Sequence, residues 1–200
     1  FEEEKWTCSA SMLNGKLEGA NSGLRWGLSI RIFDGLRTVY GYTNEQEEEK
    51  ILTVIDQLTA AIGRKRQAEC PAIQEQIIQD QHAPEIPVQS VTLAQRRALM
   101  QRANDALLNY DPVIKKAIVN QADEDQTVII ASSDGRLVRD NRQRTRLRMQ
   151  AVAMDGDRMQ NSAKAPGAHA GYEFYDQIDV EAMARDAART AKVMLNADEC

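Results

Sequence analysis

The sequence is poor in histidine and cysteine. Its two histidines, His82 and His169, lie in a proline-flanked segment and in a glycine/alanine-rich segment. A zinc peptidase of the common type needs two imidazoles on one helical face, and neither histidine is placed for that role. The three cysteines lack CxxC spacing, which argues against a zinc knuckle or a disulfide framework and makes a reducing cytoplasm the expected compartment. The sequence therefore predicts no metal or cofactor site.

Long apolar runs are also missing. No stretch reaches the roughly 18 to 20 apolar residues needed to cross a bilayer. The N-terminal EEE is acidic where a signal peptide would be basic and then apolar. A membrane is therefore not an expected partner.

Basic residues are outnumbered, because 25 Lys and Arg face 30 Asp and Glu, for a formal net charge of −5. That balance gives no general electrostatic reason to expect nucleic acid as a partner. One local exception is a row of arginines that would line one face of a strand: Arg142, Arg144, Arg146 and Arg148. The row could bind phosphate or an acidic partner, or it could be a solvated, ion-paired face. Nucleic-acid binding by the row would weaken steeply with salt.

Motifs for catalysis are absent. No motif joins a cysteine to a histidine base, and there is no GxSxG elbow or GxxxxGK[ST] loop. Ser132 and Ser133 precede an Asp-Gly pair and are typical of a turn. The acidic residues 123–125 are expected in a solvated hairpin loop, without the burial or partner that acid–base chemistry requires. No catalytic residue is predicted.

Turn dipeptides between β-branched segments are the clearest positive signal. They are Asn14-Gly15, Asp34-Gly35, Asp134-Gly135 and Asp155-Gly156. Such pairs favour tight hairpins because glycine accepts positive φ. Strands are therefore expected over residues 5–42 and 113–163, with a flexible loop over 164–171.

Helices are indicated by capping pairs followed by apolar stripes. Asn44 with Glu47 predicts a helix over about 46–62, and Thr92 with Gln95 predicts one to about 109. Asp179 is expected to cap a last helix over 179–195. The proline-interrupted connector 64–91 shows only a hint of a helical turn, at Ile73, Ile77 and Ile78. Strands, helices, strands and a helix in this order predict an α+β fold, with antiparallel hairpins or meanders and two to three amphipathic helices packed on the sheet.

Four segments in order resemble the N-terminal half of the TldD/PmbA family, once named as modulators of DNA gyrase. They are residues 15–44 (GKLEGANSGLRWGLSIRIFDGLRTVYGYTN), 107–112 (LLNYDP), 132–160 (SSDGRLVRDNRQRTRLRMQAVAMDGDRMQ) and 171–195 (GYEFYDQIDVEAMARDAARTAKVML). The resemblance spans nearly the whole chain. It implies that residues 1–200 are the N-terminal domain of a protein whose catalytic domain would follow.

The resemblance also implies a function. The family is one of cytoplasmic zinc metallopeptidases that act on unfolded peptides as homodimers, or as heterodimers with a related subunit. Zinc is held there by an HExxxH helix and a later cysteine in the C-terminal domain, so no catalytic or metal residue transfers to this chain. The family's Gly-rich loop is partly matched by residues 167–171, which adds His169 to the four arginines as a candidate partner or substrate contact. We expect a scaffold, dimerisation and substrate-enclosing domain that is inactive alone. The alternative is a noncatalytic binding or assembly partner, or a regulator, without proteolytic activity.

Overall fold

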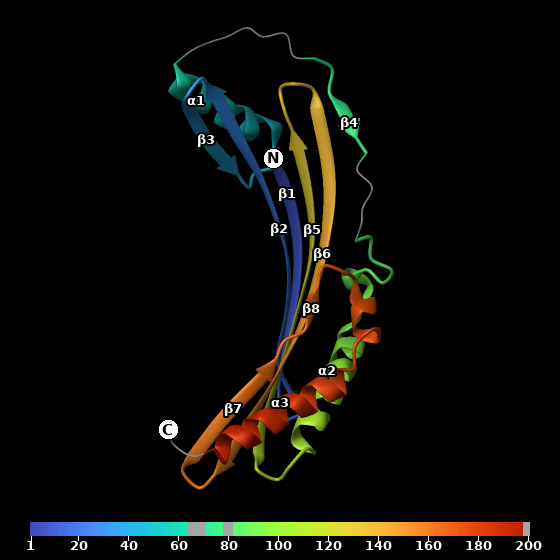
Figure 1. Cartoon of the computed structure of the whole chain (residues 1–200). Coiled ribbons are helices and arrows are strands. Elements are labelled where there is room, and N and C mark those ends of the chain that lie inside the picture. Colours follow the sequence, from blue (N-terminus) through green and yellow to red (C-terminus); the bar gives the residue numbers. More distant parts are fainter. Residues whose placement is uncertain (64–70, 78–81, 198–200) are drawn as a thin grey trace. The chain divides into compact units, whose positions relative to one another are not determined.

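The computed structural model describes residues 1–63, 71–77 and 82–197. Its centre is an eight-stranded sheet in the order β3-β2-β1-β5-β6-β4, with β7 and β8 also paired to β6 (Figure 1). The strands are β1 (Glu2–Leu13), β2 (Lys16–Asp34), β3 (Arg37–Thr43), β4 (Gln74–Gln76), β5 (Ile114–Ala131), β6 (Arg136–Asp155), β7 (Arg158–Lys164) and β8 (Gly167–Ala168). The helices are α1 (Glu48–Ile62), α2 (Leu93–Leu108) and α3 (Val180–Leu195), with 3-10 turns η1 (Val88–Ser90) and η2 (Tyr172–Asp176). The predicted α+β class is confirmed.

The four predicted hairpin turns are present. Gly15, Gly35, Gly135 and Gly156 have φ values of 79°, 60°, 89° and 57°, which only glycine adopts without steric cost. Gly135 is further constrained because a Cβ there would lie 3.0 Å from the Ala72 carbonyl oxygen. The turn dipeptides therefore set where the long strands reverse.

The chain divides into two compact units. The first comprises Phe1–Trp6, Leu24–Gln81 and Gln126–Asn141, and the second comprises Thr7–Gly23, His82–Asp125 and Arg142–Cys200.

In the first unit, α1 packs on the β2–β3 hairpin. Ile30 of β2 is in register with Gly41 of β3, and a Cβ at Gly41 would lie 3.1 Å from Val54 and 3.2 Å from Leu58 of α1. This close approach buries Leu58 and Ile62. The apolar stripe predicted for this helix therefore faces the hairpin.

The predicted capping role of Asn44 is wrong. The N-cap of α1 is Glu47, which makes no side-chain capping bond. The residue after Asn44 donates its backbone N–H to Thr43 Oγ1 at 3.0 Å, so the chain stays extended until the helix begins at Glu48. Glu48 and Glu49 lie in the first turn, where their negative charges interact favourably with the positive end of the helix dipole.

The connector 64–91 also differs from expectation in its described part. Instead of a helical turn, Gln74–Gln76 form β4, which pairs in parallel with residues 136–138 of β6. Ile73 and Ile77 flank this strand, and Ile78 lies outside the described residues. The strand forms because a free edge of β6 offers hydrogen bonds that the local sequence does not signal.

In the second unit, α2 and α3 cover one face of the sheet. Met100 and Leu107 of α2 share a core with Leu147 and Met149 of β6, and four buried alanines of α3 complete it: Ala184, Ala187, Ala188 and Ala191. Both predicted caps are confirmed. Thr92 and Gln95 form a reciprocal capping box, and Asp179 accepts the Ala182 N–H at 2.8 Å.

Two segments expected as loops belong to the sheet. Residues 123–125 lie inside the continuous strand β5, and Gly167–Ala168 form β8, which pairs with residues 145 and 146 of β6. In both cases an adjacent strand satisfies the backbone groups, and that neighbour is distant in the sequence.

Candidate substrate-contact pocket

Strand β6 separates a buried face from an exposed one in the second unit. Gln143, Thr145, Leu147 and Met149 are buried, whereas Arg144 and Arg146 between them are exposed. This two-residue period is what the arginine row predicts for a strand with one face on a core. The arginines therefore point away from α2 and α3, which share the core with Leu147 and Met149.

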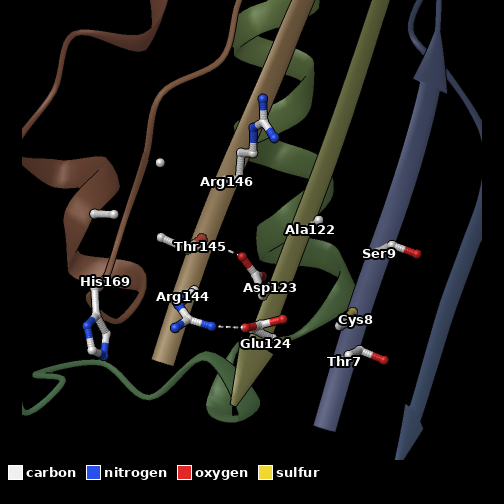
Figure 2. Close-up of a pocket in the computed structure, with 12 residues that line it drawn as sticks. Thr7, Cys8, Ser9, Ala122, Asp123, Glu124, Arg144, Thr145, Arg146 and His169 are labelled. Carbon is white, nitrogen blue, oxygen red and sulfur yellow. Dashed lines mark hydrogen bonds and ion pairs between the residues drawn. The ribbon is translucent and has the colours of Figure 1, made fainter. Parts of the chain in front are cut away.

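A pocket of about 540 Å³ opens over this part of the sheet. It brings together Arg144 and Arg146 from β6 with His169, which follows β8 (Figure 2). Thr7, Cys8 and Ser9 of β1 and Ala122, Asp123 and Glu124 of β5 complete the lining with Thr145, Gly167 and Ala168. Three of the five predicted contact residues thus share one pocket, while Arg142 and Arg148 are not among its lining residues.

Strand β8 explains why His169 lies beside the arginines. Gly167 and Ala168 pair with Arg146 and Thr145 in antiparallel register, so the next residue along, His169, reaches the level of Arg144. The two strands approach closely, because a Cβ on Gly167 would lie 2.9 Å from the Thr145 carbonyl oxygen and 3.3 Å from Arg146 Cβ. Glycine at 167 is therefore needed for this wall of the pocket.

The arginines of the row differ in their partners. Arg144 Nη1 lies 2.6 Å from Glu124 Oε1, an ion pair across the two strands that Figure 2 marks. Arg148 donates to Gln150 Oε1 at 2.6 Å, and Arg142 also has an interaction partner. Within the described residues Arg146 alone in the row has no hydrogen bond or ion pair, and its guanidinium extends away from the Arg144–Glu124 pair.

The two histidines are brought together. The rings of His82 and His169 stack with centroids 4.6 Å apart and an interplanar angle of 28°. Both are exposed. Their contact joins residues 87 positions apart in the sequence, and no local pattern could have signalled it.

A buried polar network lies on the opposite side of the same strands. Asp123 forms an ion pair with Arg96 of α2 and accepts a hydrogen bond from the Thr145 hydroxyl. Thr145 Oγ1 is also 2.8 Å from the Tyr175 hydroxyl oxygen, and burial raises the pKa of Tyr175 above its usual value. Glu124 pairs with Arg144, and Asp125 accepts hydrogen bonds from Gln89 and Gln143. The expectation of solvated carboxylates without a partner is therefore wrong for Asp123, and the expected lack of a partner is wrong for all three.

The sequence predicts a loop over residues 123–125, which conceals this network. The structure shows that the two-residue period that buries Ala117, Val119 and Gln121 continues to Asp123 without a break. Arg96 then meets Asp123 because α2 crosses the buried face of β5. Its guanidinium also donates to the Val88 carbonyl oxygen at 2.5 Å.

The pocket lining combines charged, polar and small side chains. Across residues 1–63, 71–77 and 82–197, no group of three or more His, Cys, Asp or Glu side chains could hold a metal ion. The donor set therefore does not fit the zinc site of a peptidase. What the lining offers is a guanidinium, an ion pair and an imidazole beside small apolar side chains.

No helix in the described part of the chain is long and apolar enough to cross a membrane.

Comparison with known proteins covers both parts of the chain. A family model described as PmbA/TldA metallopeptidase domain 1 matches residues 1–62. A second, the PmbA/TldA metallopeptidase central domain, matches residues 86–195.

Curated relatives are longer than this chain. A metalloprotease of Methanothermobacter thermautotrophicus is 26% identical over 194 residues, which cover 96% of this chain and 41% of that protein. A metalloprotease of Synechocystis is 30% identical over 89 residues, covering 44% of this chain and 19% of that protein. The chain thus spans about two fifths, or less, of the curated relatives it matches.

Solved structures share the fold at low sequence identity. A proposed modulator of DNA gyrase from Bacteroides thetaiotaomicron matches the whole chain with a TM-score of 0.79 at 11% identity, over 46% of that protein. Another from Thermotoga maritima gives 0.76 at 12% identity, over 44%. TldE from Thermococcus kodakarensis gives 0.64 at 13% identity, covering 96% of this chain and 43% of that one. The central-domain model matches more than half of the chain, and the domain 1 model matches the part before it. The chain therefore belongs to the PmbA/TldD metallopeptidase family.

Proposed function

We propose that this chain is the scaffold, dimerisation and substrate-enclosing part of a cytoplasmic zinc metallopeptidase that acts on unfolded peptides. By itself the chain is inactive, because the zinc ligands reside in a following catalytic domain. The subunit pairs with a second copy or with a related subunit. The exposed pocket over β6 and β8 forms part of the surface that an unfolded peptide meets.

The observation that carries the proposal is the match to two successive domains of a metallopeptidase family in a chain that spans 41% of a curated metalloprotease. The pocket supports the enclosing role. It lies on the sheet face that α2 and α3 leave open, so an extended peptide has access to it.

Three quantities test the proposal on the native gene product purified from its own cell: intact mass, zinc content and cleavage of an unfolded protein such as reduced casein. We expect a chain much heavier than 22.4 kDa, about one zinc per catalytic subunit and cleavage that a chelator abolishes. The 200-residue chain should show no cleavage under the same conditions.

The alternative is a noncatalytic binding or assembly partner. A heavier native chain without zinc and without cleavage, purified together with a related subunit, would favour it. A native chain of 22.4 kDa without zinc would overturn the peptidase proposal altogether.

A further inference from the structure

We propose that the pocket over β6 and β8 binds a carboxylate of an extended acidic peptide segment, with Arg146 as its anchor. This inference rests on the proposed enclosing role and adds the chemistry of the segment that is enclosed. It concerns binding alone and requires no zinc.

The guanidinium of Arg146 differs from those of its neighbours in the arginine row. Arg144 is engaged by Glu124 at 2.6 Å and Arg148 by Gln150 at 2.6 Å, whereas Arg146 has no polar partner among the described residues. An arginine presents a planar fork of donors that fits the two oxygens of a carboxylate. Within the described part of the pocket, Arg146 is thus the group able to form a new charge-assisted pair without breaking another.

Glu124 neutralises the adjacent arginine. It lies 2.6 Å from Arg144 in the pocket wall, so Arg146 supplies the positive charge that this ion pair leaves uncompensated. A singly charged carboxylate needs only Arg146. A phosphate group carries about −1.5 to −2 charges, more than one guanidinium neutralises.

Several small residues line the pocket that contains Arg146. Gly167 is in register with Arg146, and Ala122 and Ala168 also belong to the lining. Small residues leave room for a main chain to lie along the strands, with its side chain directed at Arg146. The pocket therefore suits an extended peptide.

Nucleic acid fits less well. Its affinity comes from several phosphate contacts at once, and three of the four arginines in the row already have partners. The chain as a whole carries a net charge of −5, which repels a polyanion.

The test uses the full chain and two fluorescent peptides of alanine and serine. One carries a single glutamate and the other a glutamine at the same position. Fluorescence anisotropy gives the two affinities. We expect the glutamate peptide to bind about tenfold more tightly than the glutamine peptide, because it forms one additional charge-assisted hydrogen-bonded pair.

Substitutions test whether Arg146 causes the preference for the glutamate peptide. Arg146→Gln should remove the preference for glutamate, and Arg146→Lys should keep part of it because a point charge replaces the fork. Arg97→Gln is the matched control, since Arg97 is exposed on α2, the helix that covers the other face. Circular dichroism and thermal melting verify that each variant is folded.

Amide NMR shifts locate the bound peptide. We expect the largest changes at Gly167, Ala168 and residues 144–146. Equal affinity for the two peptides, an equal loss in Arg97→Gln, or shifts confined to other strands would each overturn the inference. So would tighter, steeply salt-dependent binding of a single-stranded oligonucleotide, which would identify the row as a nucleic-acid surface.

A negative result for carboxylate binding at Arg146 is distinguishable from a negative result for the proposed peptidase function. Zinc content and cleavage are measured on the native protein, whereas the peptide preference is measured on this chain without metal. A zinc peptidase whose N-terminal part ignores the glutamate would overturn the anchor and leave the peptidase proposal standing.

Discussion

Arg96 and Asp123 form an ion pair whose side chains are almost completely withdrawn from solvent, with exposed fractions of 3% and 0%. The pair joins α2 to the middle of β5, and the Thr145 hydroxyl adds a hydrogen bond to the same carboxylate. Two buried charges are tolerated because each is matched by the other and by nearby polar groups. The pair therefore links α2 to the sheet behind the pocket.

Removing one partner should be costly. We expect Asp123→Ala to lower the free energy of unfolding by about 3–5 kcal/mol, because the Arg96 guanidinium is left buried without a counter-ion. The double variant Arg96→Met with Asp123→Leu should recover most of this loss, since no charge remains in the core. Urea denaturation of Arg96→Met, Asp123→Leu and the double variant measures the coupling between the two residues. Additive losses would show that the two residues do not act as a pair.

Gly167 controls the wall of the pocket. In Gly167→Ala the new methyl would meet the Thr145 carbonyl oxygen at 2.9 Å, so β8 must shift away from β6. We expect a loss of about 1–3 kcal/mol, the usual cost of overpacking, together with altered amide shifts at residues 145 and 146. Gly23→Ala is the control, because nothing lies within 4 Å of its added methyl, and it should change stability by less than about 0.5 kcal/mol. Equal effects of the two substitutions would contradict the close approach.

Glu173 makes the stability of the second unit depend on pH in the acid range. Burial raises the pKa of Glu173, but bonds from the backbone N–H groups of Ile86 at 2.9 Å and Gly171 at 2.8 Å outweigh it, so its pKa in the folded chain lies below the usual value. A carboxyl with a lowered folded pKa contributes stability above its unfolded pKa. That contribution is lost as the pH falls from about 4.5 through the lowered folded pKa.

The pH experiment compares the chain with Glu173→Gln. We expect the variant to be less stable at neutral pH by about 1–3 kcal/mol, because hydrogen bonds to a charged acceptor are lost. The difference between the two proteins should shrink below pH 4.5. Thermal melting across the acid range provides the data. A constant difference at all pH values would mean that the Glu173 charge contributes nothing.

Leu58 and Leu52 offer a matched pair on α1. Leu58 is 8% exposed and packs over Gly41, whereas Leu52 is 50% exposed. Leu58→Ala should therefore cost about 2–5 kcal/mol and speed hydrogen exchange throughout α1, while Leu52→Ala should change little. Similar exchange rates in the two variants would show that this helix is not held by its packing on the hairpin.

The sequence by itself determined the features that depend on neighbours in the chain. Asn-Gly and Asp-Gly pairs set the four turns because their backbone conformation is local. The capping box at Thr92 and the cap at Asp179 likewise involve residues three apart. The alternation along β6 placed Arg144 and Arg146 on one face, because the strand period is a property of the backbone alone.

Only the tertiary structure decided which distant groups meet. Asp123 finds its partner only because Arg96, 27 positions earlier, reaches it from α2, and nothing near either residue signals that contact. The same holds for β4 beside β6, for β8 beside Arg146 and for His82 stacked on His169. Such pairings exchange hydrogen bonds and charge between segments far apart in the chain, so their free energy exists only once the sheet has formed. Local patterns predicted the turns, two of the caps and the exposed arginines, and the fold of the sheet brought the residues of the pocket together.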